Sequence, residues 1–70
     1  MPRNISWRKA VKKFKRLGFT GPHPGGRHLF MEKDGHSVHI PNPHEGDISR
    51  GLMAEILHKA EIENDDWENA

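Results

Sequence analysis

The chain has 70 residues, a formal net charge of +1 and no cysteine. This length allows one small domain, over residues 1–70, and the lack of cysteine excludes disulfide staples and thiolate zinc sites. No apolar run approaches the roughly 18 residues that span a bilayer, and the N-terminus lacks the apolar core of a signal peptide, so we expect a cytoplasmic protein with no membrane contact.

The charges are divided between the two halves of the chain. Residues 1–31 carry eight Lys or Arg and no acid, whereas residues 32–70 carry three cations and all ten acids. Such a division predicts a polyanion partner for the first half. It also predicts an acidic tail, over about residues 63–70, that is held apart from the basic half or bound to something basic.

A first helix is predicted after Ser6, which is a suitable N-cap, and it ends at Gly18, which favours the left-handed backbone of a helix stop. Apolar residues recur at helical spacing between these two positions. They are Trp7, Ala10, Val11, Phe14 and Leu17.

The remaining positions of this helix are all cationic, namely Arg8, Lys9, Lys12, Lys13, Lys15 and Arg16. Like charges three or four residues apart repel each other, and a phosphate backbone would relieve that repulsion. We therefore interpret these side chains as contacts with RNA. The alternative is an ordinary solvated lysine face.

A short strand is expected to begin at Phe19 and Thr20 and to end in a loop of glycines and prolines over 21–26. Next, the Asp-Gly pair at 34 and 35 predicts a two-residue hairpin between strands at 28–33 and 36–40.

The hairpin register assigns the side chains of the two strands to two faces of the sheet. The core face is predicted to hold Leu29, Met31, Val38 and Ile40. The open face is predicted to hold His28, Phe30, Glu32, Ser37 and His39. A phenylalanine between two histidines, His28 and His39, on an otherwise wet face indicates a ligand or a partner chain.

A second helix is predicted after Pro41 and Pro43, capped by Asp47 or Ser49. Gly51 inside it predicts close packing of another element. Ile62 and Trp67 are candidates to extend the core, and the last few residues look disordered. The apolar stripe of this helix consists of Ile48, Leu52, Met53, Ile56, Leu57 and Ala60.

The order of one helix, three strands and a second helix predicts an α+β fold. The economical packing is a three-stranded antiparallel sheet with both helices on one face. Double-stranded-RNA-binding domains share this α-β-β-β-α layout and follow an RNA duplex by its shape and phosphates.

Spacings such as His23 to His28 and His39 to His44 could be proposed as metal-ligand pairs, but no cysteine and no HExxH pattern accompanies them, so a metal site is the minor alternative. We expect His23, His36 and His58 to be surface or structural residues. His28 and His39 differ because the register places them on one open face, with Arg27 beside His28. Imidazoles transfer protons near neutral pH and an arginine stabilises phosphorane charge, so this group suits RNA cleavage without a metal or other cofactor.

Four segments, in order, resemble the HicA family of toxins from toxin-antitoxin pairs, and the resemblance covers nearly the whole chain. They are "LGF" at 17–19 after the basic helix, Gly-x-His at 26–28, "IPNPH" at 40–44 and "DISRGLMAEILHKA" at 47–60.

The resemblance implies the toxin of a type II pair, an mRNA endoribonuclease that inhibits translation and is neutralised by a HicB antitoxin. The family's catalytic histidine corresponds to His28, although the common Gly-Ser-His motif has Arg27 in its middle here. His44 corresponds to a histidine before the last helix, expected to organise the helix start or to touch phosphate.

The predicted RNA contacts are therefore the cations of the first helix together with Arg27, His39 and His44. The predicted antitoxin-facing residues are His28, Phe30 and His39. Two other functions stay open, a non-catalytic module that binds double-stranded RNA and a protein that only holds its partner.

Overall fold

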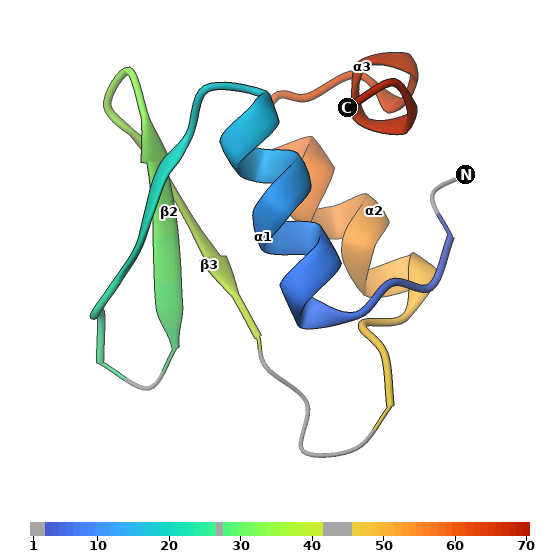
Figure 1. The fold of residues 1–70 in the computed structure, drawn as a ribbon, viewed down its shortest axis with the longest axis horizontal. Helices are drawn as coiled ribbons and strands as arrows, with labels where there is room; N and C mark the ends of the chain where they lie inside the picture. Colours follow the sequence, from blue (N-terminus) through green and yellow to red (C-terminus); the bar gives the residue numbers. More distant parts are fainter. Residues whose placement is uncertain (1–2, 27, 42–45) are drawn as a thin grey trace.

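The computed structural model describes residues 3–26, 28–41 and 46–70. The elements are α1 (Trp7–Arg16), β1 (Thr20–His23), β2 (Leu29–Lys33), β3 (His36–Ile40), α2 (Arg50–Lys59) and α3 (Asn64–Glu68). The three strands form one antiparallel sheet in the order β1-β2-β3, and the helices lie on one side of it (Figure 1). The predicted α+β fold with a three-stranded antiparallel sheet is confirmed.

The first helix has the predicted ends. The Ser6 hydroxyl accepts a hydrogen bond from the backbone N–H of Lys9 at 3.2 Å, and Gly18 follows the helix with a φ of 96°. Both α1 and α2 have ten residues. Of the helices in the described part of the chain, none has the length and apolarity that a membrane span requires.

The β2–β3 hairpin has the predicted register. Leu29 lies opposite Ile40 and Lys33 opposite His36. Both turn residues have positive φ, 49° at Asp34 and 83° at Gly35, as the favoured two-residue turn requires.

One expectation for the core face is wrong. Met31, Val38 and Ile40 are buried, but Leu29 is 37% exposed. Leu29 is the first residue of β2, at the end of the sheet, where the helical layer covers Ile40 of β3 and leaves its neighbour partly open to solvent.

The first strand begins at Thr20, one residue later than predicted, and extends further than predicted, through Gly21 and Pro22 to His23. Thr20 pairs with Glu32 and His23 with Phe30, and the register shifts between the two pairs. Proline lacks an N–H, and a shifted register leaves a residue unpaired. An edge strand tolerates both, because it pairs with a neighbour on one side only.

The second helix begins at the later of its two candidate caps. The Ser49 hydroxyl accepts a hydrogen bond from the N–H of Leu52 at 3.2 Å. Just before it, Ile5 and Ile48 exchange two backbone hydrogen bonds of 3.0 and 2.7 Å. These bonds attach the N-terminal segment to the start of α2.

The acidic tail is folded, although its last few residues were expected to be disordered. Of the two alternatives for this tail, it is not held apart from the basic half but contacts it through Lys13, and Trp67 extends the core as predicted. The tail residues form α3, and Trp67 is 1% exposed within the core. The Trp67 and Phe14 rings have centroids 4.9 Å apart. Burying an indole favours docking of this segment against α1, and the opposite charges of the acidic segment and the basic helix favour it too.

Gly51 does not pack against another element, so that expectation is also wrong. A Cβ at Gly51 would meet nothing within 4 Å, and the same is true at Gly35, whose φ is 83°. The two positions therefore have the same open space around a Cβ, and they differ in backbone conformation.

We therefore expect Gly51→Ala to raise the free energy of unfolding by about 1 kcal/mol, because alanine favours a helix more than glycine does. Gly35→Ala, the matched control, should lower it by about 1–2 kcal/mol, because a side chain strains the left-handed backbone. Urea unfolding followed by circular dichroism measures both. A loss of stability in Gly51→Ala would contradict the open surroundings of this glycine.

The buried indole predicts a large effect of Trp67→Ala, a loss of about 3–5 kcal/mol of unfolding free energy. Such a loss is most of the stability of a domain this small. Glu68→Ala, an exposed change in the same helix, should stay within about 0.5 kcal/mol of the parent. Equal unfolding midpoints for the two variants would contradict the docking of α3.

Candidate active site

His28 lies at one end of the sheet, in a bend directly before β2, and it is exposed. Gly26, two residues earlier, has a φ of 74°, a conformation that glycine adopts without strain. An exposed imidazole can exchange a proton with a bound molecule near neutral pH. The position of His28 is thus compatible with its predicted role, while Arg27 lies outside the described residues.

The start of α1 lies toward the same end of the molecule (Figure 1). The Trp7 indole Nε1 donates a hydrogen bond of 3.3 Å to the carbonyl oxygen of Ile40, the partner of Leu29 in the sheet. At the other end of α1, the Leu17 carbonyl oxygen accepts a hydrogen bond of 2.6 Å from Lys33 Nζ. Helix α1 therefore runs in the same direction as β2.

This direction divides the cations of α1 into two groups. Arg8 and Lys9 lie in the turn nearest the start of β2, whereas Lys15 and Arg16 lie at the far end of the helix. A strand of five residues spans about 16 Å, so the far group is separated from the His28 end by about that distance.

Three aromatic rings lie side by side on the open face of the sheet, one from each strand. Phe30 is the Cα partner of both His23 and His39. The ring centroids are 5.2 Å apart for His23 and Phe30 and 5.8 Å apart for Phe30 and His39. We call His23, Phe30 and His39 the ring platform.

The platform corrects the sequence analysis in one respect. Phe30 lies between His39 and His23, whereas we expected His28 as the second histidine. His23 is a partly exposed, hydrogen-bonded histidine, as expected, and only its place beside Phe30 was not predicted. Periodicity did not reveal His23, because the register shift between Thr20 and His23 interrupts the alternation of the strand. The Gly-Pro pair before it also suggested a loop.

The cations of α1 and the ring platform lie on opposite sides of the sheet. Met31 faces the helices and is buried, so its neighbour Phe30 faces away from them. Of the predicted RNA contacts, His39 is on the open face and the cations of α1 are in the helical layer. His44, like Arg27, falls outside the described residues.

Lys13 is engaged within the protein, unlike its exposed neighbour Lys12. Its Nζ donates a hydrogen bond of 3.1 Å to the carbonyl oxygen of Trp67 and lies 5.1 Å from the centroid of the Trp67 ring. This side chain attaches α3 to α1, and a contact with RNA would compete with that attachment.

In the described part of the chain, His36 and His58 lie away from the platform. His36 lies on β3 with its Nε2 3.5 Å from the Glu61 carboxylate, and both side chains are largely exposed. His58 is exposed on α2. Within residues 3–26, 28–41 and 46–70, no three His, Asp or Glu side chains gather in a way that could hold a metal ion.

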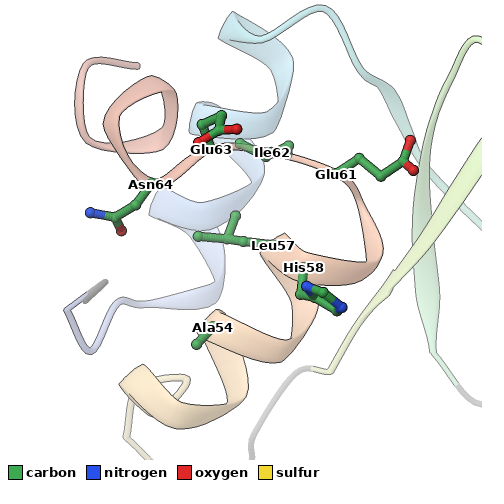
Figure 2. Close-up of a pocket in the computed structure, with 7 residues that line it drawn as sticks. All are labelled: Ala54, Leu57, His58, Glu61, Ile62, Glu63 and Asn64. Carbon is green, nitrogen blue, oxygen red and sulfur yellow. The ribbon is translucent and has the colours of Figure 1, made fainter.

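A shallow hollow of about 590 Å³ lies between α2 and the start of α3, and Figure 2 shows the residues that line it. Its polar side chains do not converge, since Glu61 and Asn64 extend toward opposite sides. The hollow is lined by residues of α2 and of the segment that leads into α3, and α3 lies at the other end of the molecule from the start of β2 (Figure 1). It is therefore a poor candidate for the active site.

The family model that describes the HicA toxin of bacterial toxin-antitoxin systems matches residues 7–62. This chain belongs to the HicA toxin family. The match includes α1, the sheet and α2, and it ends before α3. A search of curated proteins found no match. As a member of the HicA family, the protein is the toxin of a toxin-antitoxin pair, which implies an antitoxin partner.

The contacts of Lys13 predict that Lys13→Ala lowers the free energy of unfolding by about 1–2 kcal/mol, through loss of the hydrogen bond and the cation–π contact. Lys12→Ala, the exposed neighbour, should change it by less than about 0.5 kcal/mol. Thermal and urea unfolding of the two variants provide the comparison. If both variants unfold together with the parent, Lys13 does not anchor α3.

Proposed function

We propose that this HicA protein is an mRNA endoribonuclease in which His28 transfers the proton that starts cleavage. The observation that supports this most directly is the exposure of His28 at the start of β2, toward the end of the molecule where the basic helix α1 begins. Proton transfer and phosphate contacts can thus act on the same stretch of RNA.

RNA contains its own nucleophile, the 2′-hydroxyl of the ribose. A neutral imidazole at His28 takes the proton of that hydroxyl, and the 2′-oxygen forms a bond to the adjacent phosphorus. The bond from phosphorus to the 5′-oxygen then breaks, and a proton from water completes the new 5′-hydroxyl. The products are a 2′,3′-cyclic phosphate and a 5′-hydroxyl end, and the reaction needs neither a metal ion nor another cofactor.

The cations of α1 hold the RNA backbone in this proposal, and those nearest the start of β2 contribute most. Arg8 and Lys9 lie in the turn closest to that end, and Lys12 is exposed one turn later. Arg27 next to His28 is assigned to the developing negative charge on the phosphorane, since an arginine suits that charge. His44 is assigned to a phosphate contact.

The antitoxin is proposed to be a HicB-type protein that covers His28 and the open face around Phe30 and His39. Covering His28 blocks the approach of a ribose hydroxyl and stops cleavage without changing the fold of the toxin. The open face is available for this contact because the helices pack on the other side of the sheet (Figure 1).

Replacing the proposed base gives the central test. His28→Ala should lower the cleavage rate by about 10²–10⁴-fold, the usual contribution of a general base. Expression of this variant in a bacterial host should leave growth and mRNA intact. His58→Ala, a matched change of an exposed histidine on α2, should be as toxic as the parent. Equal toxicity of all three proteins would remove His28 from the mechanism.

Two controls separate this mechanism from the alternatives. An RNA whose ribose at the cleaved position lacks the 2′-hydroxyl should stay intact, and EDTA should leave the rate on ordinary RNA unchanged. If the parent protein binds duplex RNA and leaves every RNA intact, the non-catalytic binding module is the correct function. The exposed cations of α1 are the feature that favours that alternative.

A further inference from the structure

The ring platform of His23, Phe30 and His39 has a composition that the cleavage mechanism does not explain. Proton transfer uses His28, which lies before β2, while the platform crosses all three strands. His39 is exposed, and His23 and Phe30 are partly exposed. The rings are tilted by 41° and 49° to their neighbours, so each one, rather than the three together, can stack with one flat group.

The platform is held in place by the chain around it. A Cβ at Gly25 would lie 2.5 Å from Phe30 Cδ1, so the ring uses the space that a side chain would need there. On the other side, the Thr20 hydroxyl and His23 Nε2 are hydrogen-bonded at 3.1 Å. Gly25 and Thr20 therefore keep the rings of Phe30 and His23 in register with each other.

The chemistry of the platform favours nucleic-acid bases over an apolar protein surface. Its three rings include two imidazoles, which can carry positive charge, and it has one fully apolar member, Phe30. The exposed large aliphatic residues Leu29 and Leu52 are not part of it. Glu32, the acid on this face, lies in the next row, between Thr20 and Ser37.

We propose that the ring platform stacks unpaired bases of single-stranded RNA and delivers the adjoining ribose to His28. This inference rests on the proposed function, and it specifies the substrate as RNA that is single-stranded at the site. A duplex hides the faces of its bases inside its own stack, so rings on a protein surface can reach base faces only in unpaired RNA.

The proposal also assigns different partners to the two sides of the molecule. The cations of α1 are on the helical side and can contact the phosphates of any RNA, whether paired or unpaired. The platform is on the open side and contacts bases. The binding of single-stranded RNA should therefore depend on both the cations of α1 and the ring platform, whereas the binding of duplex RNA should depend on the cations of α1 alone.

The test measures RNA binding in the His28→Ala protein, where the RNA stays intact. The probes are a single-stranded RNA of mixed sequence with 2-aminopurine in place of one adenine, and a hairpin duplex of similar length. In this protein, Phe30→Leu should weaken single-stranded binding by about tenfold and abolish the fluorescence quenching that accompanies stacking. Duplex binding should not change.

Three further variants control for indirect effects. Phe30→Tyr keeps a ring and should bind as the parent does, whereas Gly25→Ala displaces the Phe30 ring and should weaken single-stranded binding. Ser37→Ala, an exposed change on the same face, should have no effect. Circular dichroism and thermal unfolding of each variant confirm that the fold is kept.

Single-stranded binding that is unchanged in Phe30→Leu, or duplex binding that falls equally, overturns the proposal. If Phe30→Leu instead weakens only the complex with the antitoxin, the platform is a protein-binding surface and the proposal is wrong. The proposed cleavage fails by a different result, namely RNA that stays intact when it is incubated with the parent protein, which has His28. Because binding is measured without His28, the two failures can be told apart.

Discussion

The helices of this small protein cover one face of its three-stranded sheet, and the rest of the structure depends on this constraint. Met31, Val38 and Ile40 take the covered face and are buried beneath the helical layer. The alternating residues must then face solvent, whether they are polar or not. Phe30 is partly exposed for this reason, and its position between His23 and His39 makes the open face chemically distinct from an ordinary wet surface.

The core is completed by a segment beyond the match to the HicA family. Trp67 of α3 packs on Phe14, and Phe14 also contacts Phe19 edge to face at 5.1 Å. This aromatic cluster brings an acidic helix next to a basic one, with Lys13 between them. The acids of α3 therefore lie close to the far end of α1, which favours contact of a polyanion with the other end of the helix, nearer to His28.

The cations of α1 and the rings of the open face lie on different sides of the sheet. This fold does not provide a single basic surface for both the phosphates and the bases of RNA. The helical side provides charge, the open side provides rings, and His28 lies at the end of the sheet, beside the start of β2. In the proposed function, RNA that contacts all of these groups passes around that end of the sheet, and a single strand bends far more easily than a duplex.

Local patterns in the sequence predicted the hairpin, because an Asp-Gly turn with two positive φ values leaves one favoured register, and they predicted α1 through Ser6, Gly18 and the helical spacing between them. His28 as the proposed base came from the resemblance of a short motif to the HicA family. Long-range packing decided the rest. Trp67 docks on Phe14 and accepts a hydrogen bond from Lys13, both more than fifty residues away from it in the chain. The place of His23 depends on a register shift in β1 that no periodicity reveals, because the shift interrupts the alternation of the strand and is defined only by its pairing with β2.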